Sequence, residues 1–145
     1  MIEKFQFYID SNLAKKETLD PEEAKSLMEK SLLRLRFIKS LRIDELNSTF
    51  IFEEAYECMR EASQSLMSLK GFKPYSHEAL IAFIKEFYKF DESDISTFDR
   101  YRILRNNCVY RAAKVSPIIC KDAVKFAEIF LSKIKAAFDK QRSMK

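Results

Sequence analysis

The sequence predicts an all-α protein, an antiparallel up-and-down helical bundle of four to five main helices plus a short N-terminal helix. Turn-forming residues are scarce: the 145-residue chain has one Gly and three Pro, whereas Gly alone makes up about 7% of average proteins. A sheet protein of this size needs many tight turns, which draw on such residues. Apolar residues also recur at spacings of three and four, the pattern of helices with one buried face.

The first two helices are predicted from periodicity and from a strong start signal. Apolar residues at helical spacing indicate a short helix within residues 1–16. Polar residues 15–18 then form a connection. Asp20 followed by Pro21 predicts the next helix start, because Asp caps helices and Pro suits their first position. This helix is expected to extend to about Leu41.

A longer helix is predicted over residues 49–70, where the three-four rhythm is clearest. It ends at Gly71, the only glycine, because glycine readily adopts the left-handed conformation just past a helix end. Residues 72–75 are expected to form a turn. Ser76 is a good cap for a helix over residues 76–88.

Two further helices complete the predicted bundle. The acidic run at residues 91–94 ends one helix and caps the next, over residues 93–113. Ser116 and Pro117 repeat the cap-plus-proline start, and the last helix ends in a basic tail. We expect a single domain over residues 1–145, with 1–19 as an N-terminal extension and 20–140 as the bundle.

Composition excludes several classes of site. Cys58, Cys108 and Cys120 form no CxxC pair, so we expect buried, reduced thiols in a cytoplasmic protein, without disulfides or zinc. A single glycine cannot build a glycine-rich nucleotide loop, and no metal or cofactor is expected. No apolar stretch reaches the roughly 18 residues of a membrane span. The net charge of +4 permits a polyanionic partner without demanding one.

Arg105 breaks the pattern of its helix. It projects into a predicted apolar arc formed by Phe98, Tyr101, Leu104, Cys108, Val109 and Ala112. A guanidinium cannot lose its charge, so it needs a partner there. One interpretation is a buried carboxylate or a contact across a dimer interface. The other is a phosphate, with Asn106 and Tyr110 as neutral hydrogen-bonding neighbours and Arg102 and Arg111 as further phosphate or RNA ligands.

The run from Phe98 to Tyr110 resembles the signature helix of HEPN domains, in which Arg is followed by a polar residue, three to five further residues, and His. The segment over residues 52–71 looks like the long central helix of that family, and residues 75–81 look like its entry into the following helix. The similarity covers about residues 21–138.

The resemblance implies a helical bundle that forms homodimers and brings two motif copies into one cleft. Many HEPN domains are metal-independent ribonucleases in toxin–antitoxin or defence systems, and small members act beside a minimal nucleotidyltransferase. Carried over by position, Arg105 binds the scissile phosphate, and Asn106 orients either that arginine or the phosphate. Tyr110 stands at the position of the motif's His, and a phenol is a poor base at pH 7. His77, the only histidine, is the remaining auxiliary imidazole, although we expect it to contact its preceding turn.

Three functions follow as alternatives. The first is a module that binds RNA or a nucleotide beside a nucleotidyltransferase, in a toxin–antitoxin or stress and defence system. The second is an active metal-independent endoribonuclease that uses Arg105, Asn106 and Tyr110, with His77 in support. The third is a structural dimer subunit in which Arg105 joins two copies.

Overall fold

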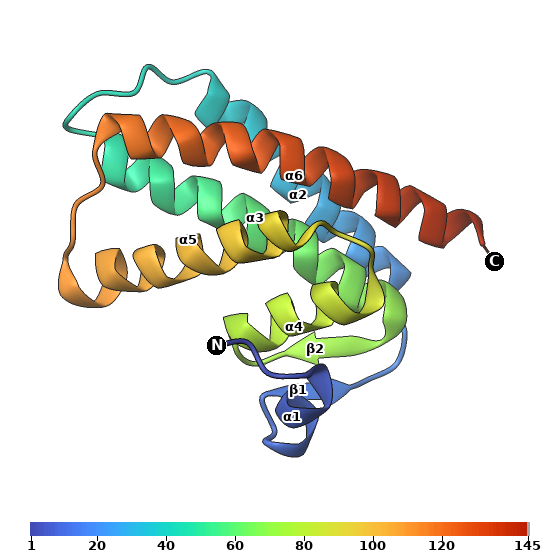
Figure 1. The fold of residues 1–145 in the computed structure, drawn as a ribbon. Coiled ribbons are helices and arrows are strands. Elements are labelled where there is room, and N and C mark those ends of the chain that lie inside the picture. Colours follow the sequence, from blue (N-terminus) through green and yellow to red (C-terminus); the bar gives the residue numbers. More distant parts are fainter. Residues whose placement is uncertain (145) are drawn as a thin grey trace.

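The computed structural model describes residues 1–144, and these form six helices and one small sheet, so the prediction of an all-α bundle is confirmed. The elements in chain order are α1 Phe5–Asp10, β1 Ala14–Lys16, α2 Pro21–Lys39, α3 Ser48–Lys70, β2 Phe72–Pro74, α4 His77–Phe87, α5 Glu92–Arg111 and α6 Pro117–Ser143. Figure 1 shows α2 and α5 running in one direction and α3 and α6 in the other. Helix α3 is central, because α2, α4, α5 and α6 all pack against it.

Local sequence signals place the bounds of α2 to α5 and the start of α6 to within about two residues. The Asp20 carboxylate accepts a hydrogen bond from the Glu23 amide at 2.9 Å, and the Ser76 hydroxyl accepts one from the Ala79 amide at 3.0 Å. Gly71 has a φ of 79°, so it occupies the left-handed position that its place after α3 predicted. These caps satisfy backbone groups that a helix end leaves without intrahelical partners.

The N-terminal region differs from the prediction. Helix α1 ends at Asp10, because Asn12 adopts a φ of 60° and turns the chain. Residues 14–16, expected as a connection, form β1, and residues 72–74, expected as a turn, form β2. The two strands pair antiparallel, with Ala14 opposite Pro74. No local pattern predicted this pairing, because the two strands are distant in the sequence and each is only three residues long.

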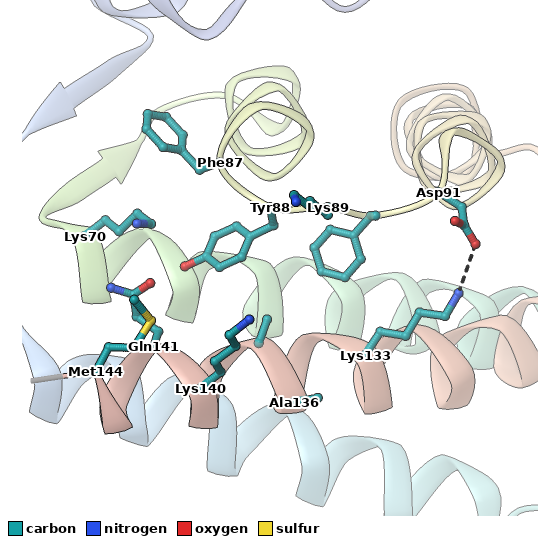
Figure 2. A pocket seen from close by; sticks show the side chains of 12 residues that line it. Lys70, Phe87, Tyr88, Lys89, Asp91, Lys133, Ala136, Lys140, Gln141 and Met144 are labelled. Carbon is teal, nitrogen blue, oxygen red and sulfur yellow. Dashed lines mark ion pairs between the residues drawn. The ribbon is translucent and has the colours of Figure 1, made fainter.

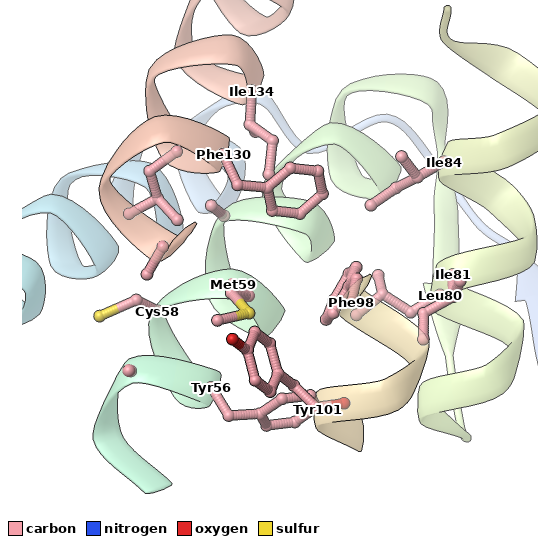
Figure 3. Close-up of a cluster of buried hydrophobic side chains, with 14 of the residues drawn as sticks. Tyr56, Cys58, Met59, Leu80, Ile81, Ile84, Phe98, Tyr101, Phe130 and Ile134 are labelled. Carbon is pink, nitrogen blue, oxygen red and sulfur yellow. The ribbon is translucent and has the colours of Figure 1, made fainter. Parts of the chain in front are cut away.

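The core lies between α3 and its neighbours and is rich in aromatic rings. Figure 3 shows Tyr56 and Met59 of α3 facing Phe98 of α5 and Phe130 of α6. The ring centroids of Phe98 and Phe130 are 5.3 Å apart in an edge-to-face arrangement, a favourable geometry for aromatic pairs. All three cysteines are buried, as predicted.

One ion-pair network joins α2 to α3 inside the bundle. Glu61 is 2% exposed, and its carboxylate accepts a hydrogen bond from Nε of Arg34 at 2.9 Å. Arg34 also contacts Glu54, about two helical turns before Glu61 on α3. A buried carboxylate of this kind depends on its partner, because an unpaired charge in the interior is very costly.

Among the described helices, none combines the length and the apolar character that crossing a membrane requires.

Candidate functional site

The second half of α5 projects beyond the core, so the predicted apolar arc around Arg105 is only partly buried. Phe98 and Tyr101 pack inside the bundle, but Val109 is 46% exposed and Ala112 is exposed. Helix α5 ends at this point, because Ala112 adopts a left-handed φ of 55°. Arg105 is therefore a half-buried residue at the edge of the core rather than a charge enclosed by apolar side chains.

The Arg105 guanidinium lies between two tyrosine rings. Its central carbon is 6.0 Å from the ring centroid of Tyr56 and 6.0 Å from that of Tyr110, the distance range of cation–π contacts. Nη1 donates a hydrogen bond of 3.3 Å to Oδ1 of Asn106. No carboxylate within residues 1–144 lies within 4 Å of the guanidinium nitrogens. An intrachain buried carboxylate is thus excluded as the partner of Arg105 within the described residues.

Arg60 and Arg102 differ from Arg105, because each has a carboxylate partner. Nε of Arg102 donates to Asp99 at 2.7 Å, and its Nη1 lies 3.8 Å from Glu78. On α3, Arg60 pairs with Glu57 and donates to Gln64. Arg102, predicted as a phosphate ligand, therefore has most of its charge already compensated.

His77 hydrogen-bonds to a residue of α3, a contact that the sequence did not indicate. Its Nδ1 and the Tyr56 hydroxyl oxygen are 2.8 Å apart and hydrogen-bonded. The two rings also stack, with centroids 5.5 Å apart and planes inclined by 12°. Burial, together with the positive charges of Arg105 and Arg60, lowers the pKa of His77 to about 4. The imidazole is consequently neutral at pH 7.

Tyr56 links His77 to Arg105, although the sequence indicated only a core residue at this position. Its side chain is fully buried, and burial raises the pKa of the phenol above its ordinary value of 10. It touches His77 of α4 on one side and Arg105 of α5 on another. One signal was available: a buried tyrosine needs a hydrogen-bond partner for its hydroxyl, and the partner is the single histidine.

The other predicted residues lie at the outer end of α5. Tyr110 is 75% exposed, and its ring lies beside the Arg105 guanidinium. Arg111 is the last residue of α5 and is exposed. The structure therefore brings Arg105, Asn106 and Tyr110 together and places His77 one tyrosine ring away, while Arg111 lies at the rim.

A small hollow of about 190 Å³ opens beside His77 and is lined also by Arg60, Gln64, Tyr75 and Ser76. Arg105 does not line this hollow. Beside the hollow, the Tyr56 ring links a guanidinium without a carboxylate partner to a neutral imidazole. These groups suit a phosphodiester better than a metal ion, and within residues 1–144 no three His, Cys, Asp or Glu side chains gather at metal-binding distance.

Comparison with known proteins adds no family to this description. No protein-family model matches the chain, and no curated protein is significantly similar to it. The HEPN resemblance stays a hypothesis that rests on the motif and on the order of the helices.

Proposed function

We propose that this chain is a HEPN-like module that binds RNA or a nucleotide through Arg105. In this proposal it acts as a homodimer, beside a minimal nucleotidyltransferase, in a toxin–antitoxin or stress and defence system. One observation carries the binding role: within the described cluster, Arg105 lacks the carboxylate partners that Arg60 and Arg102 have. A guanidinium fixed between two rings is ready to form two parallel hydrogen bonds to a phosphate.

Asn106 and Tyr110 fit the same role. Asn106 accepts a hydrogen bond from Arg105 and so orients the guanidinium. Tyr110, being largely exposed, offers a ring face and a hydroxyl beside the same guanidinium. Aromatic faces beside positive charge are common where single-stranded nucleic acid binds, because bases stack on them. This combination supports binding of an RNA strand without requiring a motif histidine.

The alternative of a metal-independent endoribonuclease is favoured by one separate observation. The structure brings the only imidazole of the chain to the Tyr56–Arg105 pair, although His77 comes from a different helix. If Nδ1–H of His77 donates to the Tyr56 oxygen, Nε2 is the acceptor that a general base needs. A pKa of about 4 keeps that nitrogen unprotonated at neutral pH and makes it a weak base.

The test measures RNA binding and RNA cleavage in the same samples. Labelled single-stranded RNA is incubated in EDTA with the wild-type chain, Arg105→Ala, Tyr110→Phe and His77→Gln. Arg36→Ala is the matched control. Arg36 is exposed on α2, and its replacement removes one positive charge outside the candidate site. We expect salt-sensitive binding that Arg105→Ala weakens at least tenfold and Arg36→Ala leaves nearly unchanged.

The outcomes separate the three functions. If the wild-type chain binds RNA without cleaving it, and Arg105→Ala no longer binds, the binding module is supported. Cleavage lost in both Arg105→Ala and His77→Gln establishes the ribonuclease. If RNA binding is equal in all variants while Arg105→Ala converts a dimer to a monomer in light scattering, the residue is a structural contact and the proposed function is wrong.

A further inference from the structure

A groove, separate from the small hollow beside His77, lies at the opposite end of α4. Its cavity of about 630 Å³ is formed where the C-terminal part of α6 passes the end of α3 and the α4–α5 connection. Figure 2 shows Tyr88 and the side chains of Lys70 and Lys140 converging on this space. The volume is in the range of small-molecule sites. Helix α4 has 11 residues, so its two ends are roughly 15 Å apart.

Aromatic rings form the wall of the groove on the side of the α4–α5 connection. Phe87, Tyr88 and Phe90 all line it. The Tyr88 and Phe90 centroids are 6.2 Å apart, and Phe90 in turn contacts the core ring of Phe130 at 5.5 Å. The wall is therefore anchored in the bundle. Ala136 of α6 also lines the groove.

The Tyr88 hydroxyl is a buried donor without a partner. Its oxygen is shielded from solvent and has no hydrogen-bond partner among the described residues. Burial raises the pKa of this phenol to about 12, so it keeps its proton. Leaving such a group unsatisfied is costly, and native proteins do so rarely. Binding of a ligand acceptor in the groove, with displacement of the side chains that cover this oxygen, would satisfy it.

Positive charge surrounds the same space. Four lysines and one carboxylate line the groove. Lys133 is occupied, because its Nζ lies 2.6 Å from Asp94 and 3.7 Å from Asp91. Lys70 has no carboxylate within 4 Å in residues 1–144, and its Nζ lies 5.7 Å from the Tyr88 centroid and 5.8 Å from the Phe87 centroid. Lys140 also lacks such a partner in that range.

From these contacts we infer that the groove binds a small aromatic phosphate ester. The ring of the ligand stacks on the aromatic wall, and its phosphoryl group lies between Lys70 and Lys140, where it accepts a hydrogen bond from the Tyr88 hydroxyl. The ammonium groups of Lys70 and Lys140, with that of Lys89 also unpaired in the groove among residues 1–144, match a phosphate monoester, which carries close to two negative charges at pH 7, better than they match a monocarboxylate. The rings favour an aromatic body over an alkyl chain.

This site is independent of the proposed function. Its residues come from the ends of α3, α4 and α6, whereas Arg105 and His77 lie at the other end of α4. Variants in one place therefore test it without touching the other. Arg105→Ala serves as the control that excludes occupancy of the first site.

The test uses isothermal titration calorimetry of the full chain at 0.15 M salt with 5′-AMP as the probe. Adenosine lacks the phosphoryl group, ribose 5-phosphate lacks the aromatic ring, and octyl phosphate replaces the ring with an alkyl chain. We expect 5′-AMP to bind at least tenfold more tightly than each of these. On addition of 5′-AMP, the backbone amide resonances of Ala136 and Gln141, which line the groove, should shift in ¹⁵N NMR spectra.

Three variants locate the binding energy. Lys140→Glu should weaken 5′-AMP binding at least tenfold. Lys125→Glu is the matched control, because Lys125 is exposed on α6 outside the groove and undergoes the same charge reversal. Tyr88→Phe should weaken binding about fivefold while the midpoint of thermal unfolding does not fall, because an unpartnered hydroxyl is removed.

Several results would overturn the inference. Equal weakening by the two lysine variants would show only general attraction of anions to a basic protein. Equal binding of octyl phosphate would contradict the aromatic specificity. Loss of binding in Arg105→Ala with retention in Lys140→Glu would place 5′-AMP in the first site. Absence of 5′-AMP binding to the wild-type chain would reject the site without bearing on RNA binding.

Discussion

The neutral state of His77 at pH 7 is a prediction that a direct titration can test. His77 is the only histidine in the chain, so its imidazole C–H resonances are unique in an NMR spectrum. We expect them to titrate with a pKa of about 4, against 6.5 for an unperturbed imidazole. Burial is the largest cause, and Arg105 is the next. Arg105→Ala should therefore raise the pKa of His77 but leave it below 6.5, while Arg36→Ala should not change it.

The same shift makes the folding stability depend on pH. Between pH 6.5 and 4 the unfolded chain binds a proton at His77 that the folded chain does not, so the free energy of unfolding falls as the pH is lowered through this window. From pH 7 to pH 5 the two pKa values correspond to about 2 kcal/mol. The imidazole is only partly buried, and solvent screening reduces this loss to about 1 kcal/mol.

Urea denaturation at pH 7 and pH 5 measures this contribution when wild type is compared with His77→Gln. The carboxylates are the same in both proteins, so they cancel in the comparison. Wild type should lose about 1 kcal/mol more stability than the variant on acidification. An imidazole pKa of 6.5 or above, or equal losses in the two proteins, would refute the packing of His77 against Tyr56 and Arg105 described above.

The remaining predictions concern the stability of the bundle, measured by chemical denaturation. Arg34→Ala leaves the Glu61 carboxylate buried without its main partner and should cost about 3–5 kcal/mol; a cost under 1 kcal/mol would contradict the network. Phe130→Ala should cost about 3–5 kcal/mol, whereas Phe37→Ala, at an exposed ring, should cost under about 1 kcal/mol. Gly71→Ala places a methyl group 2.7 Å from a backbone oxygen at a φ of 79°, so it should destabilise by more than about 1 kcal/mol; an unchanged unfolding midpoint would contradict this geometry.

Features that depend on neighbouring residues were predictable from the sequence. Asp20, Ser76 and Ser116 cap helices where their sequence contexts indicated, and Gly71 ends α3 in the left-handed conformation. Capping acts over about four residues, and the apolar rhythm of a helix acts over one or two turns. The fold class and most bounds of α2 to α6 follow from such short-range rules, whereas the end of α1 does not.

The parts of the candidate site come from sequence positions that no local rule connects. The anomaly of Arg105 was visible in the sequence, and the motif that resembles HEPN domains supplied its neighbour Asn106. Tyr56, however, reads as one more core residue in the rhythm of α3, and His77 reads as the first residue after a cap. Their hydrogen bond joins residues 21 positions apart.

The sequence by itself therefore determined a helical bundle, most bounds of its main helices and one arginine that interrupts an apolar pattern. Only the tertiary structure decided that β1 pairs with β2, that Arg105 has no acidic partner within the described chain, and that Tyr56 joins it to His77. The physical reason is distance along the chain. Propensity, capping and periodicity are local free energies, whereas the pairing of side chains from α3, α4 and α5 depends on how whole helices pack against one another.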